Sequence, residues 1–271
     1  MNRARVISVS SLSQTWHLMK LEPETKVEAF PGQFIHLRLT ETTDPLLRRP
    51  FSVHYIDPKD NSLWILFEEL GKGTALMSQL SPGNMVEFLG PLGNGFKLGE
   101  KDQDIAIVAG GIGVAPLYFL ASVLQQKNIN STFLFGVKTR SEVPDLDHFR
   151  QIGVEPVLYT EDGSLGKKGK VTKGLRELFN HREEQNKMNP DGILACGPLK
   201  MLSAVVEEAN LENIPVQVSL EAPMACGVGA CLGCVCRIKT GEDANSSEYR
   251  RVCKEGPVFP GEMVVFEDVS E

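Results

Sequence analysis

Four of the six cysteines lie in a short, uncharged stretch near the C-terminus, residues 224–236, with the sequence MACGVGACLGCVC. Cys226, Cys231 and Cys234 follow the pattern C-x4-C-x2-C, and Cys253 comes after a longer gap. This is the plant-type spacing of [2Fe-2S] ligands, whereas zinc sites usually contain two C-x2-C pairs and this chain has one. The spacing therefore favours an iron-sulfur cluster over structural zinc.

The fourth ligand of such a cluster has two candidates, Cys236 and Cys253. Cys236 lies only two residues beyond Cys234, so both thiols would have to wrap around the same small loop. The distant Cys253 is therefore the favoured ligand, and Cys236 is interpreted as a spare thiol. The residues between the cysteines are small enough for backbone amides to turn toward the sulfur atoms. They are Gly227, Gly229, Ala230 and Gly233.

Cysteine usage also bears on the compartment. Five cysteines lie beyond residue 225, and cysteines spread for a disulfide framework would not cluster in this way. Disulfides stay a minor alternative to metal binding or redox chemistry. Residues 1–20 mix apolar with polar side chains, unlike a signal peptide, and no apolar stretch is long enough to span a bilayer. We therefore expect a cytoplasmic protein that does not interact with membranes.

The size and charge of the chain restrict its class further. Of its 271 residues 42% are hydrophobic, enough for a large core in two domains or in one domain with an appendage. The net charge of -7 argues against nucleic acid as a partner, because phosphate binding needs an excess of Lys and Arg on one face.

Residues 1–100 contain short apolar runs that are separated by turn signals, with no helical period between them. In QFIHLRL, Ile35, Leu37 and Leu39 alternate with His36 and Arg38, which predicts a strand with one buried face. Several short strands at this spacing predict a small antiparallel β-barrel.

Residues 101–218 alternate between strand-like and helical segments. DIAIVAGG reads as a buried strand that enters a glycine turn, and APLYFLASVLQQKN has the length and composition of a helix. The alternation predicts a doubly wound α/β domain, with a mostly parallel sheet covered on both faces. In residues 219–271 regular periodicity disappears, which indicates a small domain organised by its metal centre.

The segment IVAGGIGVAP opens this α/β part. It places Gly110, Gly111 and Gly113 directly after a strand, and Pro116 near the start of a helix. Glycines let the backbone approach a pyrophosphate, and the helix N-terminus supplies amide donors. Because Pro116 stands where the dinucleotide motif G-x-G-x-x-G has its last glycine, a simple tight turn is the alternative interpretation.

Two segments of the barrel region are candidates for a second cofactor. LLRRPFSVHY places Arg49 beside a proline, an aromatic ring and a serine, a combination that suits a phosphate and a flat ring system. The alternative is an edge strand with surface arginines. EELGKGTALMSQL contributes Gly71, Gly73 and Thr74 ahead of an expected helix, as a second phosphate-binding turn.

The chain resembles the ferredoxin reductase-like flavoproteins in four segments that occur in the same order. These are RRPFS, GGIGVAP, the CGP that begins at Cys196 and the C-terminal cysteines. LEAPMACGVGACLGCVC and RVCKEGPVF are similar to segments of the electron-transfer subunits of NAD-dependent, two-component dihydroorotate dehydrogenases. The resemblance covers essentially the whole chain. It implies FAD in the barrel, NAD in the α/β domain and a [2Fe-2S] cluster in the last domain. It also implies an FMN-containing dihydroorotate dehydrogenase catalytic subunit as partner in pyrimidine biosynthesis, in a heterotetramer with two of each chain.

The resemblance assigns site residues by matching motifs, and it implies no side chain that acts as acid or base on an organic substrate. Phe51 replaces the tyrosine that many relatives carry, which removes a hydroxyl group but keeps a ring. The loop expected near the nicotinamide is Cys196, Gly197 and Pro198. The flavin motif is Arg49, Pro50, Phe51 and Ser52, followed by Leu66, Phe67 and Glu68 on the next strand and by Gly73 and Thr74 in the pyrophosphate turn.

Two other functions fit the same features. A subunit of another iron-sulfur flavoprotein, such as an NADH-dependent ferredoxin oxidoreductase, would contain identical parts and differ in its partner. A zinc-stabilised binding module on a nucleotide-sensing domain would be colourless. Lys138 and Arg140 lie where a ribose can bind, but two basic residues do not decide between NAD and NADP.

Overall fold

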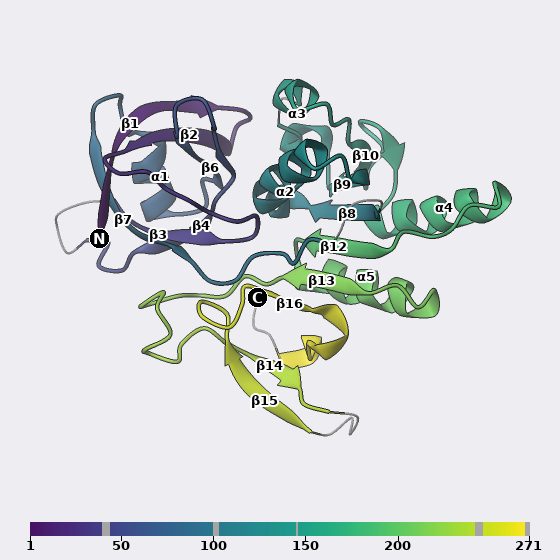
Figure 1. Ribbon diagram of the computed structural model, residues 1–271. Coiled ribbons are helices and arrows are strands. Elements are labelled where there is room, and N and C mark those ends of the chain that lie inside the picture. The colour runs from purple at the N-terminus through teal and green to yellow at the C-terminus, as the bar shows by residue number, and fades with distance from the viewer. Residues whose placement is uncertain (40–43, 100–102, 145, 242–245, 269–271) are drawn as a thin grey trace.

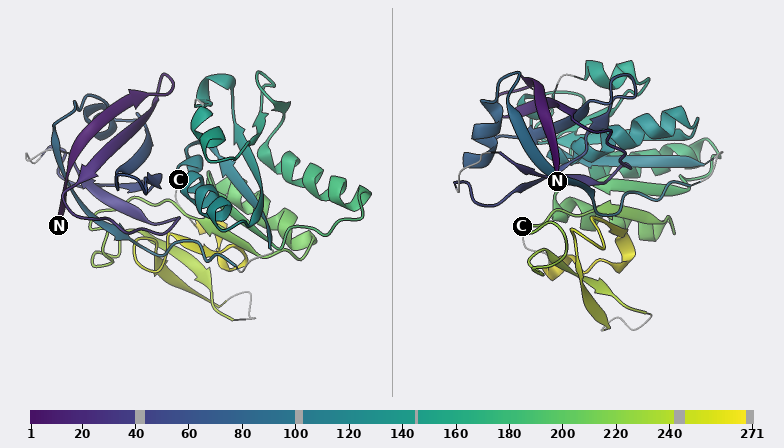
Figure 2. Two further views of the ribbon diagram at one scale, coloured as in Figure 1. Left: turned by 45° about the horizontal axis from the view of Figure 1, so that its top comes forward. Right: turned by 60° about the vertical axis from the view of Figure 1, so that its left-hand side comes forward.

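The computed structural model describes residues 1–39, 44–99, 103–144, 146–241 and 246–268. The chain forms a barrel from its N-terminal part, a large sheet with helices from its central part and a small hairpin unit near its C-terminus (Figure 1). The hairpin unit lies below both the barrel and the sheet in Figure 1, and the turned views in Figure 2 show the same three parts side by side.

The described N-terminal residues form a seven-stranded sheet in the order β4-β3-β7-β1-β2-β6-β5, and each neighbouring pair is antiparallel. The sheet curls into a barrel, as its alternating patterns predicted, around a core that includes Met19, Leu37 and Phe88. Its elements are β1 (Asn2–Ser11), β2 (Trp16–Pro23), β3 (Phe34–Arg38), β4 (Arg49–Ser52), β5 (Tyr55–Ile56), β6 (Leu63–Glu68), α1 (Lys72–Ser78) and β7 (Met85–Leu92).

Strand β3 differs from its predicted pattern of one buried face. Ile35 and Leu37 are fully buried in the barrel core, as expected, but His36 on the opposite face is also fully buried. The reason is that the cysteine-containing loop covers this face, because a Cβ atom on Gly227 would lie 2.5 Å from Nδ1 of His36. A single-strand pattern cannot show such a cover.

The central sheet has the order β11-β10-β9-β8-β12-β13-β16 among the described residues. All pairs are parallel except β13 with β16, which is antiparallel. Its strands are β8 (Asp104–Gly110), β9 (Asn130–Val137), β10 (Val157–Thr160), β11 (Lys167–Lys168), β12 (Gly192–Cys196), β13 (Val216–Ser219) and β16 (Val258–Pro260).

Helices cover both faces of this sheet, as the alternation of strands and helices predicted. Buried side chains of α2 and α3 pack against one face, and those of α4 and α5 pack against the other. The helices are α2 (Val114–Gln126), α3 (Asp147–Gln151), α4 (Val171–Glu184) and α5 (Leu199–Leu211). None of the helices in the described ranges combines the length and the apolar character that a membrane crossing needs.

The C-terminal part contains the hairpin β14 (Val235–Lys239) and β15 (Ser247–Arg251), which pair with each other. Beyond the hairpin the chain returns to the central sheet, where β16 forms its edge strand next to β13. Patterning did not predict this strand. The cysteine-rich segment is therefore held against the sheet at both of its ends.

A buried histidine lies where the barrel meets α2. His54 is fully buried, its Nδ1–H donates a hydrogen bond to the carbonyl oxygen of Ala115 at 2.8 Å, and its ring stacks on Tyr118 at 4.6 Å between centroids. Burial, and then the nearby His148, lower the pKa of His54 from 6.5 to about 3. The ring is therefore neutral in the folded protein at ordinary pH.

This histidine predicts a pH dependence of stability. Below pH 6.5 the unfolded chain binds a proton that folded His54 excludes, so stability falls as the pH drops from 6.5 toward 3. The contribution is up to about 1.4 kcal/mol per pH unit. Denaturant unfolding at pH 7, 6 and 5 should show a shallower acid loss for His54→Phe than for the parent. His181→Gln, at an exposed histidine on α4, should keep the parent slope. An unchanged slope in His54→Phe would contradict this account.

Candidate functional site

A cavity of about 300 Å³ opens at the carboxyl edge of the central sheet. Its lining includes Gly110 and Gly111 after β8, Val137 and Lys138 after β9, and Pro198 after β12. Ligands of open parallel sheets bind at this edge. Gly111 has a φ of +53°, and nothing lies within 4 Å of the position of a Cβ atom there, so its backbone faces open space. These features fit a nicotinamide nucleotide.

The glycine turn packs tightly on the loop that follows β12. A Cβ atom on Gly113 would lie 2.3 Å from the carbonyl oxygen of Cys196, and one on Gly110 would lie 2.3 Å from the sulfur of Met201. Both positions therefore exclude side chains. The structure thus brings the predicted glycines together with Cys196, Gly197 and Pro198.

The two predicted flavin segments of the barrel also meet. Arg49 on β4 extends toward the start of α1, where a Cβ atom on Gly73 would lie 2.7 Å from Nε of Arg49. The backbone N–H groups of Leu70 and Gly71 donate to Oγ1 of Thr74 at 2.9 and 3.1 Å, which fixes the turn. Helix α1 begins at Lys72, so Gly73 and Thr74 lie in its first turn rather than ahead of it. The turn and the guanidinium group together suit a pyrophosphate.

Aromatic rings continue this barrel site. Phe51 on β4 meets Phe67 on β6 edge to face, with ring centroids 6.1 Å apart. Leu66 and Phe67 are almost fully buried, whereas Pro50, Ser52 and Glu68 are partly exposed. The two strands therefore offer both a packed wall and accessible polar groups.

Glu221 interacts with residues of both cofactor sites, Glu68 of the barrel and Cys196 at the end of β12, and residue patterns did not single it out. The residue as a whole is solvent-exposed, and desolvation of its carboxyl group, followed by the charge of Glu68, raises its pKa. Burial, and then Glu221, raise the pKa of Cys196, so that thiol stays protonated. The signal for Glu221 was its place in the LEAP segment before the cysteines.

The four predicted cluster cysteines form two pairs. Cys226 and Cys231 form one pair, and Cys234 and Cys253 form the other, each linked through a backbone hydrogen bond. Backbone N–H groups of Cys231 and Cys253 donate to the sulfurs of Cys226 and Cys234, at 3.4 Å in each case. Two thiol pairs with amide donors suit a centre that contains two irons, one for each pair.

The electrostatics around Cys226 favour metal binding at the loop, whereas burial, and then Cys234, raise the pKa of Cys253 to about 12. Backbone amides of Cys231 and Val228 lower the pKa of Cys226 to about 6, which favours the thiolate that binds metal. Burial raises the pKa of Cys236 on β14 to about 11. Within the described residues, no three His, Cys, Asp or Glu side chains lie close enough together to hold one metal ion.

Arg251 clamps the cluster loop to the segment that carries Cys253. Its Nη1–H donates to the carbonyl oxygen of Gly229 at 2.8 Å, and its Nε–H donates to Glu255 at 2.9 Å. The pairing with Arg251 lowers the pKa of Glu255 to about 2. The two halves of the ligand set are therefore joined independently of any metal.

The outer side of the loop is apolar. Val228, Leu232 and Val235 are exposed by 49%, 62% and 36%, and Cys231 beside them is also exposed. Met224 is half-buried against the core. Leu232 has a φ of +57°, a conformation that is uncommon for a residue other than glycine.

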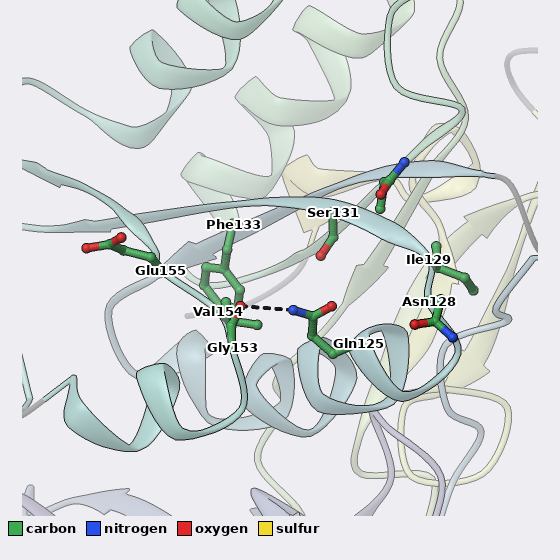
Figure 3. A pocket seen from close by; sticks show the side chains of 9 residues that line it. Gln125, Asn128, Ile129, Ser131, Phe133, Gly153, Val154 and Glu155 are labelled. Atoms are coloured by element: carbon green, nitrogen blue, oxygen red, sulfur yellow. Dashed lines mark hydrogen bonds between the residues drawn. The ribbon is translucent and has the colours of Figure 1, made fainter.

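Another cavity, of about 330 Å³, lies at the amino edge of the central sheet (Figure 3). Its wall is polar, and Gln125 crosses it by donating to the carbonyl oxygen of Gly153 at 2.9 Å. It lies at the other edge of the sheet from the glycine turn, so we do not assign it to the cofactor site.

The fold and these sites define an oxidoreductase component with a flavin, a nicotinamide nucleotide and an iron-sulfur cluster. A family model for the oxidoreductase NAD-binding domain matches residues 107–207. A model for the iron-sulfur cluster binding domain of dihydroorotate dehydrogenase B matches residues 221–265.

Curated relatives specify the family. The chain is 42% identical over 238 residues to the "dihydroorotate dehydrogenase B (NAD(+)), electron transfer subunit" of Geobacillus kaustophilus, with 87% of each chain covered. It is 39% identical over 269 residues to the protein of the same name from Desulforamulus reducens, covering 97% of this chain and 98% of the relative. The chain belongs to this family of electron transfer subunits, and its cofactors are FAD, a [2Fe-2S] cluster and NAD.

Solved structures agree with this fold. An NADH-dependent reduced ferredoxin-NADP oxidoreductase matches with a TM-score of 0.84 and 27% identity, over 98% of this chain and 91% of that chain. A ferredoxin NADP+ reductase from Neisseria gonorrhoeae, with a TM-score of 0.64 and 17% identity, covers 78% of this chain and 90% of its own, and shows the fold alone.

The contact between Arg49 and Gly73 predicts how FAD is retained. Arg49→Ala should weaken FAD binding by about 1.5 to 3 kcal/mol, because a charge-assisted contact to phosphate is lost. This corresponds to a roughly 10- to 150-fold higher Kd, which titration of the apoprotein measures. Arg48→Ala is the matched control, since that side chain points to Glu87 instead. Equal FAD affinity in Arg49→Ala and the parent would refute the assignment.

The paired thiols predict the metal content. Anaerobically purified protein should contain about two irons and two labile sulfides per chain, and zinc without sulfide would contradict this. Cys253→Ser should lose the visible cluster bands, because one of the two pairs is broken. Cys236→Ser should keep them, because this buried thiol lies outside both pairs. Loss of the bands in Cys236→Ser would show that the fourth ligand is misassigned.

Proposed function

We propose that this chain carries electrons from the catalytic subunit of a dihydroorotate dehydrogenase to NAD+. The observation that supports this most is the cluster loop, which exposes Cys231 among apolar side chains while its other side packs against the barrel. When bound, a [2Fe-2S] cluster carries one electron at a time and FAD exchanges a hydride with nicotinamide.

The residues of this chain bind and orient these groups. Arg49 and the turn at Gly73 hold the pyrophosphate of FAD, and the open backbone at Gly111 admits that of NAD. Cys226, Cys231, Cys234 and Cys253 hold the cluster. Cys196 stays protonated and neutral near the nicotinamide, where it contributes shape rather than charge. The chain supplies no acid or base for dihydroorotate, so that chemistry belongs to the partner.

The partner docks on the apolar side of the cluster loop. An exposed apolar patch on a soluble protein commonly marks a protein interface. Val228 and Leu232 surround the exposed Cys231, so a partner on this patch would approach the cluster directly. The partner contains FMN, and the complex holds two copies of each chain, as the family resemblance of the cysteine segments implies. The cysteines of this chain cluster as in a metal site rather than spread as in a disulfide framework, which suits a reducing compartment and supports the cytoplasm.

A second candidate function is that of a subunit in an NADH-dependent ferredoxin oxidoreductase. The high TM-score to a protein of that kind favours it. The cofactors would be the same, so only the partner distinguishes the two functions.

Reconstitution with the partner tests the proposal. The chain alone should pass electrons from NADH to artificial acceptors and should not oxidise dihydroorotate. With the FMN-containing dihydroorotate dehydrogenase subunit of the same organism it should form a stable complex that couples dihydroorotate oxidation to NAD+ reduction. Failure to associate and to couple would refute the proposal and favour the ferredoxin-linked function.

A substitution in the patch tests the docking site. Leu232→Asp should weaken the complex at least about tenfold, because it places a charge in an apolar contact. NADH oxidation by the free chain should stay unchanged. Leu211→Asp on α5 is a matched control, since Leu211 is also exposed but lies outside the cluster loop. Equal affinity of the Leu232→Asp and Leu211→Asp variants would place the interface elsewhere.

A further inference from the structure

The cluster loop and the barrel meet at one buried side chain, His36. This residue is central in β3, opposite Pro50 on β4 and Leu89 on β7. It is fully buried, and neither ring nitrogen makes a hydrogen bond within the usual limits of distance and angle. A buried polar side chain without such a bond is uncommon and calls for an explanation.

The ring lies directly against the backbone of the cluster loop. A Cβ atom on Gly227 would be 2.5 Å from Nδ1 and 3.0 Å from Cγ of His36. Gly227 also has a φ of +69°, in the left-handed region that favours glycine. Both the space and the conformation therefore require glycine at this point, immediately after the ligand Cys226.

The same ring faces backbone carbonyl groups of two functional segments. One belongs to Cys226, the first cluster ligand, and the other to Arg48, which precedes the flavin arginine Arg49. His36 thus touches the chain beside the cluster and the chain beside the flavin motif. Arg251 holds the far side of the loop at Gly229, so the loop is fixed between two side chains from different parts of the molecule.

We propose that His36 is a positioning residue for the iron-sulfur cluster, which sets how the loop from Cys226 to Cys231 sits on the barrel. The proposal rests on Cys226 being a cluster ligand. Without the ring, the loop loses this contact with the barrel, and the cluster becomes more accessible and less uniform in its surroundings. Partners of metal ligands commonly contribute 10- to 100-fold to metal retention.

Cluster stability in the isolated, FAD-loaded chain tests this role without dihydroorotate or a partner. Release of iron to a chelator should be at least about tenfold faster in His36→Ala than in the parent. The electron paramagnetic resonance spectrum of the dithionite-reduced cluster should also change its line shape. His36→Asn, which keeps a nitrogen near the place of Nδ1, should restore the parent line shape. The matched control is His17→Ala, at another buried barrel histidine that contacts Ser11 and Phe67.

A double substitution tests the contact from the loop side and stays informative if His36→Ala folds poorly. Gly227→Ala leaves the barrel core untouched and should release iron faster, because its methyl group collides with the ring. Combining Gly227→Ala with His36→Asn or His36→Ala should make iron release slower again, though not as slow as in the parent. The proposal is overturned if the substitutions at 36 and 227 act additively, or if His36→Ala matches the parent in both release rate and line shape. A failed dihydroorotate assay would leave these readings unaffected.

Discussion

One strip of backbone, residues 254–260, holds the barrel, the central sheet and the cluster loop together. The side-chain amide of Asn94 donates to the carbonyl oxygens of Lys254 and Glu255 at 3.1 and 2.9 Å, and its backbone N–H donates to Gly256 at 2.6 Å. A few residues later, β16 pairs with β13 of the sheet. Gly93 allows this approach, because a Cβ atom there would lie 2.6 Å from Pro257.

The placement of all three cofactors depends on this strip. Cys253 lies immediately before it, so the second thiol pair is anchored to the sheet that binds the nucleotide. Cys226 rests on the barrel through His36, so the first pair is anchored to the part that binds FAD. Electron exchange between separate centres requires that the distances between them stay constant. In this chain, main-chain pairing and close packing at Gly93, Gly227 and Gly113 fix the relative positions of the cofactor sites, rather than the cofactors themselves.

Local features of this chain were predictable because their causes are local. The strand β8, its glycine turn and helix α2 follow from the run of apolar residues that ends at Gly110. The assignment of Cys226, Cys231, Cys234 and Cys253 as cluster ligands rests on cysteine spacing and stays a prediction. Strand β16 was not predictable, because three residues carry too little pattern and its pairing partner β13 lies far away in sequence.

The burial of His36 was not predictable for the same reason, because it depends on residues that are distant in sequence. The alternation in β3 identified the face that fills the barrel, but the residues that cover the other face lie almost two hundred positions later. The pKa of Glu221 is likewise raised by burial and then by Glu68, which lies on β6 of the barrel. Contacts of this kind between distant segments form the functional site, and no single stretch of sequence contains them.

Electrons pass between NADH and the cluster within this one chain. The most direct measurement is electron paramagnetic resonance of the anaerobic, FAD-loaded protein after NADH is added, with no partner present. We expect the spectrum of a reduced [2Fe-2S] cluster in most of the molecules, and its disappearance when Cys253 is replaced by serine. A sample that gives this spectrum with dithionite but stays silent with NADH would contradict the account.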